Sequence, residues 1–145
     1  MMRIRSYQQL ESSDCAITCI RILARYYGKK ISPKYLRSLS DSSRQGLSVG
    51  DIISILTKLG FYNTCVKTTV EALEEMPLPA ILYWNNAHFI VLYKIHKNRY
   101  FIVDPAQGKI GTLPFLMNLP MKVEYGMLLK LHVLIVLSRV YPWEF

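Results

Sequence analysis

The chain has 145 residues, of which 51% are apolar and 19% charged, and 18 basic against 10 acidic residues give it a net charge of +8. This composition is typical of a folded domain with a substantial core and excludes an intrinsically disordered chain. Three cysteines without the spacing of a disulfide framework favour a reducing compartment over an exported protein.

The excess of basic residues favours an acidic partner, such as nucleic acid, a membrane surface or an acidic peptide. The basic residues are scattered and no aromatic-rich binding pattern accompanies them, which argues against nucleic acid. The N-terminus lacks an apolar core of signal-peptide length, and the longest apolar stretch, at 126–137, is too short for a membrane span. We therefore expect a single domain over residues 1–145 that does not itself cross a bilayer.

The first predicted helix covers Ser13–Tyr27, where apolar residues recur at helical spacing until Gly28 ends the run. Cys15 falls in its first turn, where the partial positive charge of the helix N-terminus favours the thiolate, which is the nucleophilic form of cysteine. The alternative is that Cys15, like Cys19 one turn later, is a small buried hydrophobic residue. Taken alone, this helix favours the alternative, because one helix cannot supply a base.

The rest of the first half is also mainly helical. Capping residues and an apolar stripe indicate three further helices, and a β-rich run indicates one strand. They are a short helix beginning at Ser32 and Pro33, a helix over Ser48–Leu59 with a capping box of Ser48 and Asp51, a strand over 61–67, and a brief helix opened by Thr68 and Glu71 before Met76.

The second half has the composition of a β-sheet. Its predicted strands cover 79–84, 88–95, 99–104 and 108–114. The second and third of these are separated by a connection of hairpin length. A helical half followed by an antiparallel half predicts an α+β domain in which the N-terminal helices pack on a C-terminal sheet, so that Cys15 lies beside the strands.

The predicted hairpin brings two chemically useful side chains to the same edge of the sheet. His88 opens one strand and Asp104 ends the next, so the antiparallel return makes them neighbours although they lie 16 residues apart. An imidazole can take a thiol proton while a carboxylate fixes the orientation of the ring. Each residue alone has a commoner explanation: histidine at a strand start is usually surface polar, and Asp-Pro usually begins a turn.

Three features in this order resemble a known family: Gln9 six residues before Cys15, the pair His88-Phe89, and the Asp-Pro-Ala-x-Gly-Lys run at 104–109. The family is the bacteriocin-processing, double-glycine leader peptidases, which are papain-like cysteine peptidase domains at the N-terminus of peptidase-containing ABC transporters. The resemblance runs from about Tyr7 to Leu113. It implies a papain-like fold in which Cys15 is the nucleophile, His88 the general base and acid, Asp104 the residue that orients His88, and Gln9 the oxyanion donor.

Two departures from the family pattern stand out. Ala16 follows the predicted nucleophile where the family usually has glycine, which affects rate or substrate fit and not the reaction class. Beyond Leu113 only Tyr125–Leu129 is loosely similar to the closing strand of the family, and the tail 130–145 stays unassigned, either as the start of a linker towards a membrane domain or as an aberrant end. The phosphate-binding loop of an ATPase is absent from this sequence.

The resemblance also implies a function and its partners. The domain is expected to cut leader peptides after a Gly-Gly pair from bacteriocin or pheromone-like precursors, in step with their export by an ABC transporter. Its partners are then a precursor with an amphipathic, acidic leader and the transmembrane and ATP-binding modules of the transporter, and its location is the cytoplasmic face of the membrane. No metal or other cofactor is required for this chemistry.

Other interpretations remain open. A non-catalytic relative of this fold would only dock the cargo of an exporter, although the presence of Cys15, His88 and Asp104 argues against it. Another papain-like thiol enzyme acting on amides, such as an acyltransferase, would use the same three residues in the same roles. A metal site of Cys15, Cys19 and a histidine is disfavoured, because zinc prefers four ligands and a second ligand pair is absent from the sequence pattern.

Overall fold

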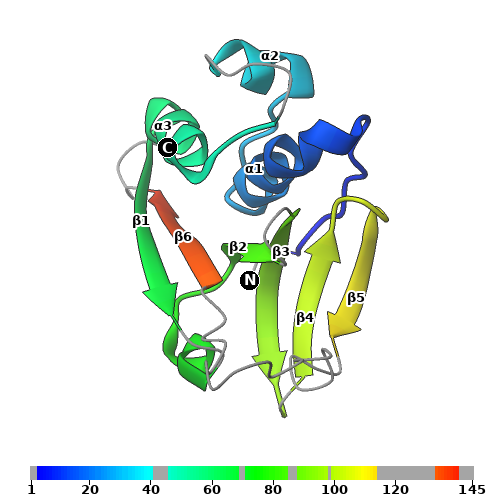
Figure 1. Cartoon of the computed structure of the whole chain (residues 1–145), viewed down its shortest axis with the longest axis vertical. Coiled ribbons are helices and arrows are strands. Elements are labelled where there is room, and N and C mark those ends of the chain that lie inside the picture. The colour runs from blue at the N-terminus through cyan, green and yellow to red at the C-terminus, as the bar shows by residue number, and fades with distance from the viewer. Residues whose placement is uncertain are drawn as a thin grey trace, which may run out of the picture.

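The computed structural model describes residues 3–40, 46–68, 71–84, 88–97, 99–113 and 133–140 of the chain. Three helices gather at one end of the molecule in Figure 1, the strands fill the remainder, and one short helical turn lies among them at the other end. The helical elements are η1 (Ser12–Asp14), α1 (Cys15–Tyr26), α2 (Pro33–Ser38), α3 (Val49–Lys58) and η2 (Glu71–Glu75), of which η1 and η2 are 3-10 helices. The strands are β1 (Phe61–Thr68), β2 (Ala80–Trp84), β3 (His88–His96), β4 (Arg99–Asp104), β5 (Lys109–Leu113) and β6 (Val133–Val140).

The described strands form one antiparallel sheet in the order β1-β6-β2-β3-β4-β5. Strand β6 lies between β1 and β2, although it is far from both in the sequence. Phe61 of β1 lies opposite Val140, and Ala80 of β2 lies opposite Leu137. The sequence left the tail 130–145 unassigned, and the structure shows that part of this tail is a strand inside the sheet. The similarity noted at Tyr125–Leu129 lies outside the described residues.

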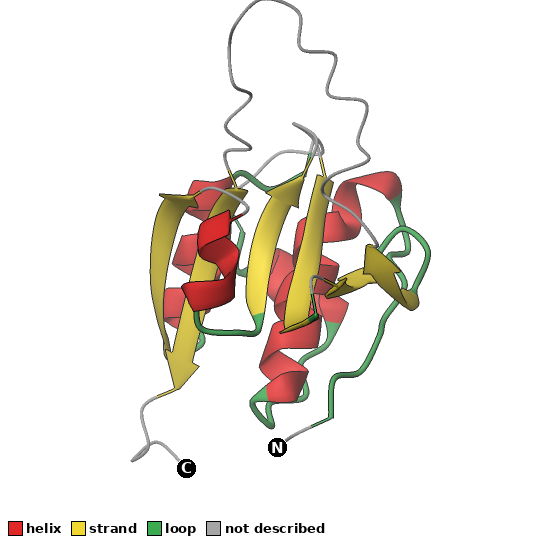
Figure 2. Ribbon diagram, turned by 90° about the horizontal axis from the view of Figure 1, so that it is seen from below, coloured by secondary structure: helices red, strands yellow, loops and turns green. Residues whose placement is uncertain are grey.

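The sheet has a hydrophobic layer on each face. Figure 2 shows it between α1, α2 and α3 on one face and η2 on the other. On the helix side, the buried residues of α1 pack with Ile81, Phe89 and Val103. On the other side, Leu73 of η2 packs with residues such as Leu92. Neighbouring residues of the central strands thus face opposite layers, as the period of two in a strand requires. The α+β architecture with helices packed on an antiparallel sheet was predicted correctly.

Local sequence features begin and end the helices where they were expected. The side chain of Ser48 accepts the N–H of Asp51, and a carboxylate oxygen of Asp51 accepts the N–H of Ser48, which completes the predicted capping box of α3. Gly28 follows α1 with a φ of 86°, a left-handed conformation that glycine adopts without strain. The brief helix expected before Met76 is the 3-10 helix η2, whereas Thr68, which was expected to open it, is the last residue of β1.

The hairpin of β3 and β4 is the part of the sheet that matters for the site. Its register pairs His96 with Arg99 at the turn and Val91 with Val103 near the open end, with an irregularity between Leu92 and Lys94. The open end of this hairpin faces α1, which packs against β3. Among the described residues, none of the helices combines the length and the apolar character that a membrane crossing requires.

Candidate active site

Cys15 is the first residue of α1, at the end of the helix where free backbone N–H groups accumulate. The preceding turn η1 leads directly into the helix, and the packing of α1 against β3 sets that end of the helix against the sheet. Only 8% of the Cys15 surface is exposed, so its thiol lies in a largely water-excluded position. The predicted placement at a helix start, beside the strands, is therefore what the structure contains.

His88 and Asp104 meet at the open end of the hairpin. Their side chains are joined by a contact of 2.7 Å between Nε2 of His88 and Oδ1 of Asp104. The backbone N–H of Ala106 donates to the same carboxylate oxygen at 2.9 Å. A second donor of this kind restrains the carboxylate, which in turn restrains the imidazole ring. The structure thus brings together two residues that the sequence separates by 16 positions.

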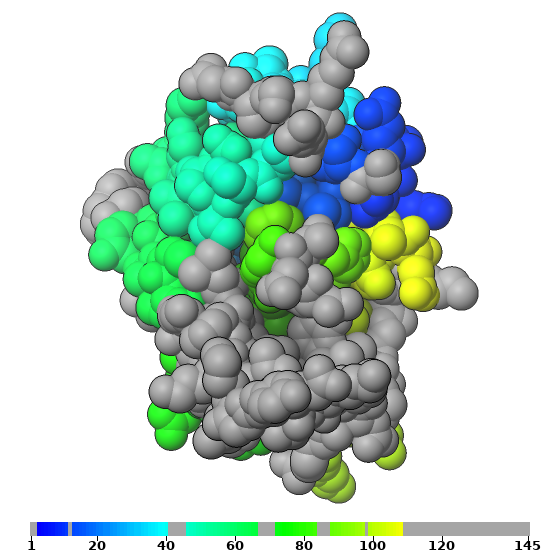
Figure 3. All heavy atoms as spheres, viewed as in Figure 1, coloured from blue at the N-terminus to red at the C-terminus, as the bar shows by residue number. Residues whose placement is uncertain are grey.

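The turn that follows Asp104 connects the hairpin to the segment before the cysteine. Its backbone is closed by N–H groups of Gln107 and Gly108 that donate to the Asp104 carbonyl at 3.2 and 2.9 Å. The N–H of Gln9 donates to the carbonyl of Pro105 at 2.9 Å. Figure 3 shows the result at the surface, where the N-terminal part of the chain (blue) adjoins the residues around this turn (yellow).

The side chain of Gln9 ends in an unusual environment. Its Oε1 atom is buried and has no hydrogen-bond partner among the described residues. A buried amide oxygen without a partner carries a desolvation cost of about 1–3 kcal/mol, so native proteins rarely leave one unpaired. Rotation about the terminal C–C bond exchanges Oε1 and Nε2, so the same position can be taken by the amide N–H groups. The described residues therefore leave one end of the Gln9 amide without a hydrogen-bond partner.

The second cysteine of α1, Cys19, has a thiol with a raised pKa. It is fully buried one turn after Cys15, and its burial raises the pKa of its thiol well above the ordinary value. Its interactions with Cys15 and with Asp104 raise that pKa further. The Asp104 carboxylate therefore acts on the Cys19 thiol of α1. Among the described residues there is no group of three His, Cys, Asp or Glu side chains that could hold a metal ion.

One interaction at this site was missed by sequence reasoning. Asp14 was expected to belong to the start of the first helix, and it does occupy the N-cap position, but its side chain makes no capping hydrogen bond. Its carboxylate instead pairs with the guanidinium group of Arg37 on α2. No local sequence pattern indicates this pair, because its two members lie 23 residues apart on different helices.

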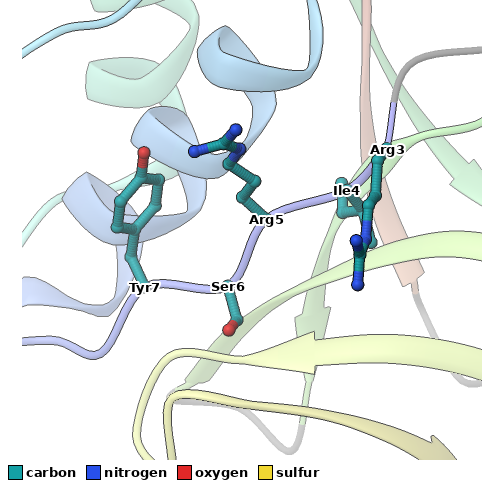
Figure 4. A pocket seen from close by; sticks show the side chains of 5 residues that line it. All are labelled: Arg3, Ile4, Arg5, Ser6 and Tyr7. Atoms are coloured by element: carbon teal, nitrogen blue, oxygen red, sulfur yellow. The ribbon is translucent and has the colours of Figure 1, made fainter.

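A basic pocket lies along the N-terminal segment. It is lined by Arg3, Ile4, Arg5, Ser6 and Tyr7, whose side chains are shown in Figure 4. The guanidinium carbon of Arg21 on α1 lies 3.9 Å from the centre of the Tyr7 ring, which attaches this segment to the helix. The pocket is contributed by a segment just before Gln9 and is not formed by the His88–Asp104 pair.

The sequence model of the Peptidase C39 family matches residues 3–113, a range that includes Gln9, Cys15, His88 and Asp104. The chain belongs to the Peptidase C39 family. The family resemblance read from the sequence is thereby confirmed. Both the N-terminal segment and the hairpin lie within the part that the family model covers.

Relatives of this Peptidase C39 domain are processing and transport proteins. The colicin V secretion/processing ATP-binding protein CvaB of Escherichia coli is 31% identical over 106 residues, covering 73% of this chain and 15% of that protein. The lactococcin-G-processing and transport ATP-binding protein LagD of Lactococcus lactis subsp. lactis is 36% identical over 110 residues, covering 72% of this chain and 16% of that protein. The matched region is a small part of each relative.

Solved structures show that the fold is that of the same family. The crystal structure of the peptidase domain of Streptococcus ComA, a bi-functional ABC transporter involved in a quorum sensing pathway, matches 96% of this chain and 100% of that chain with a TM-score of 0.77 at 20% identity. The crystal structure of a double glycine motif protease from an AMS/PCAT transporter, in complex with its leader peptide, matches 77% of this chain and 80% of that chain with a TM-score of 0.72 at 24% identity. The predicted papain-like α+β fold is confirmed.

Proposed function

We propose that this domain is a cysteine endopeptidase that removes leader peptides by cutting after a Gly-Gly pair. In this proposal Cys15 is the nucleophile, His88 the general base and acid, Asp104 the residue that orients His88, and Gln9 the oxyanion donor. The observation that carries it is the 2.7 Å contact between His88 and Asp104 at the end of the hairpin that faces the helix begun by Cys15.

The geometry of the histidine supports its role as a base. Nε2 is the ring nitrogen that contacts Asp104, so in the neutral ring the N–H at Nε2 donates to the carboxylate. Nδ1 then carries the free lone pair and can accept the Cys15 proton. The donation from Ala106 keeps Asp104 in place while the ring becomes positively charged.

The reaction then follows the order expected of a thiol peptidase. The Cys15 thiolate attacks the scissile carbonyl, and the imidazolium of His88 passes its proton to the leaving amine, which leaves an acyl-enzyme thioester. Water, deprotonated by His88, attacks this thioester and releases the leader with a free carboxylate. The oxygen of each tetrahedral intermediate carries negative charge, which the Nε2 N–H groups of the Gln9 amide can stabilise by donating hydrogen bonds to it.

Specificity for glycine would follow from a groove beside Cys15 that is too narrow for a Cβ atom on the two residues before the scissile bond. Glycine offers almost no apolar area and loses the most backbone entropy when it is ordered, so such a groove binds weakly. Affinity must then come from a remote part of the leader. A structural neighbour was crystallised with a leader peptide and is described as a double glycine motif protease, which supports this substrate class.

We infer that the remote part is an amphipathic, acidic leader helix. The net charge of +8 and the guanidinium groups of Arg3 and Arg5 in the N-terminal pocket support an acidic partner. The names of the relatives describe secretion, processing and transport. By analogy with them, the domain would act at the cytoplasmic face of a membrane beside transmembrane and ATP-binding transporter modules.

A cleavage assay tests the proposal directly. The purified domain is mixed with a synthetic precursor that has an acidic amphipathic leader ending in Gly-Gly, and the products are identified by mass spectrometry. We expect one cut after the second glycine, a sharply lower turnover when either glycine is replaced by alanine, and a raised KM when the leader helix is removed. Binding of the precursor without any cut would instead support a cargo-docking domain, and equal cutting of an Ala-Ala precursor would support a general thiol amidase.

A further inference from the structure

The carboxylate of Asp14 lies directly before the proposed nucleophile and is almost completely buried. Only 6% of the residue is exposed. Its backbone is held on both sides, because its N–H donates to the Glu11 carbonyl at 3.0 Å and its carbonyl accepts the Thr18 hydroxyl at 2.8 Å. These bonds hold the backbone of Asp14 at the start of α1.

Arg37 is the partner that makes this burial possible. Its Nε donates to Oδ1 of Asp14 at 3.3 Å, and its Nη2 contacts Oδ2, so that both carboxylate oxygens meet the same guanidinium group. This hydrogen bonding is the main cause that raises the pKa of Arg37, and it keeps the cation in place. Two-point contacts of this kind are specific to arginine, because lysine offers a single point charge.

The pair has an electrostatic consequence for Cys15. The N-terminus of α1 favours a thiolate, but an unpaired carboxylate on the adjacent residue would oppose a second negative charge. The positive charge of the Arg37 guanidinium group offsets the negative charge of that carboxylate. Other charged or titratable groups of the described residues around α1 include Tyr7, Glu11, Cys19, Lys34 and Tyr35 on α2, Tyr83 on β2, His88 and Tyr93 on β3, and Asp104 on β4. On α3, Asp51 and Lys58 bond to Ser48 and Leu39 instead.

We propose that Arg37 is a positioning residue of this active site, which holds Asp14 in its buried place and cancels its charge so that the Cys15 thiolate can form. The inference rests on the proposed role of Cys15 as nucleophile. It adds α2 to the site, since that short helix otherwise contributes only Leu36 to the buried core. Arg37 acts through Asp14 and needs no contact with the substrate.

A pH profile of thiol alkylation separates this role from a structural one. The intact domain is treated with iodoacetamide across a range of pH, and modification of Cys15 is followed by mass spectrometry of its peptide. Four variants are compared with the wild type: Arg37→Gln, Arg37→Lys, Asp14→Asn and the double variant Asp14→Asn/Arg37→Gln. No substrate is needed, so the result is independent of the cleavage assay that tests the proposed function.

The proposal predicts opposite shifts for the two single variants. Arg37→Gln leaves the carboxylate unpaired and should move the midpoint of the profile up by about one pH unit. Asp14→Asn leaves the cation unopposed and should move the midpoint down. The double variant should return to near the wild-type midpoint, and Arg37→Lys should lie between the wild type and Arg37→Gln, because the charge is kept but the two-point contact is lost.

A purely structural tie between α1 and α2 predicts a different pattern. Breaking the pair from either side would then have the same effect, and the double variant would show no recovery. Shifts of the same sign in Arg37→Gln and Asp14→Asn would therefore overturn the proposal, as would an unchanged midpoint in Arg37→Gln. If Arg37→Gln fails to fold, the sign of the Asp14→Asn shift still decides, because an upward shift contradicts the proposed charge balance.

Discussion

Cys15 and Cys19 lie one turn apart on α1 and meet different surroundings. Cys15 begins the helix and keeps a small exposed surface, whereas Cys19 is fully enclosed in the core. Burial, followed by the interactions with Cys15 and Asp104, raises the pKa of Cys19. A raised thiol pKa means that less thiolate exists at any given pH below it, so Cys19 is a poor nucleophile at neutral pH. Burial also raises the pKa of Cys65 on β1.

The first prediction follows from this difference. Cys15→Ala should abolish cleavage of a Gly-Gly precursor, whereas Cys19→Ser and Cys65→Ser should keep most of the activity. Cys19→Ser is also expected to lower thermal stability, because it places a hydroxyl group in the apolar core. Turnover of each variant is measured beside its circular dichroism spectrum. A Cys19→Ser variant that folds and is as inactive as Cys15→Ala would contradict the assignment.

The second prediction concerns the orientation of the imidazole. His88→Ala should be inactive, Asp104→Asn should be milder, and Asp104→Ala should be more severe than Asp104→Asn. The reason is that an amide oxygen can still accept the N–H of Nε2, whereas alanine leaves the ring without its partner. The order of kcat values checks this prediction. Full activity in both Asp104 variants would remove Asp104 from the site.

The third prediction concerns Gln9. Gln9→Ala should lower turnover by roughly 10²–10³, with little change in the binding of the leader, because an oxyanion donor acts in the transition state. Steady-state kinetics separate kcat from KM, and a fluorescence titration with Cys15→Ala and Cys15→Ala/Gln9→Ala measures leader binding without turnover. A defect confined to binding would contradict an oxyanion role.

At the scale of elements, the turn after β4 joins the hairpin to the segment before α1. Gly108 has a φ of 61°, and a Cβ added there would lie 2.7 Å from Cβ of Gln8. Such a contact is too close for carbon atoms, and the left-handed conformation disfavours any residue with a side chain. The turn therefore holds Asp104 at one end and supports Gln8 and Gln9 at the other.

The fourth prediction tests this coupling. Gly108→Ala should lower the free energy of unfolding by at least about 1–2 kcal/mol, which is the cost of a left-handed conformation alone, and should reduce turnover by displacing Gln9. Urea denaturation and the cleavage assay measure the two effects. Gly50→Ala in α3 is the matched control, because a Cβ there meets only Ser48 Oγ at an ordinary 3.6 Å, and alanine favours a helix. Equal stability in the two variants would contradict the proposed close packing at Gly108.

At the scale of the whole molecule, charge is the main feature that the fold displays to a partner. The net charge is +8, and the basic pocket of Arg3 and Arg5 adjoins the segment that carries Gln9. Long-range attraction of this kind weakens with salt, because the screening length falls from about 10 Å at 0.1 M to about 3 Å at 1 M ionic strength. The attraction of a remote acidic leader would weaken with salt, whereas the part-buried His88–Asp104 contact at 2.7 Å would be screened less.

The fifth prediction uses that contrast. Raising the sodium chloride concentration should raise the KM for a precursor with an acidic leader and leave kcat nearly unchanged. A matched precursor whose leader carries glutamine in place of each glutamate should show a weaker salt dependence of KM. The double variant Arg3→Gln/Arg5→Gln of the domain should likewise show a weaker salt dependence of KM for the acidic precursor. Identical salt profiles for the acidic and neutral leaders would show that the basic surface does not select the leader.

Much of the site could be predicted because its parts are local in sequence. The capping box of Ser48 and Asp51 involves residues three positions apart, and the hairpin of β3 and β4 closes over a very short connection. Such elements form from near neighbours, so residue type and spacing indicate them directly. The hairpin alone was enough to predict that His88 and Asp104 would end up side by side, and the motifs around them indicated the family.

Only the tertiary structure decided the features that join distant segments. The tail strand β6 enters the sheet between β1 and β2, where it faces partners more than 50 residues away, and Asp14 finds its counter-charge on a different helix. An apolar β-rich run is compatible with many strand partners, and an arginine on a short helix is compatible with many acids. Which partner is chosen depends on the packing of the whole core, because each pairing must satisfy burial, hydrogen bonding and charge together with all the others.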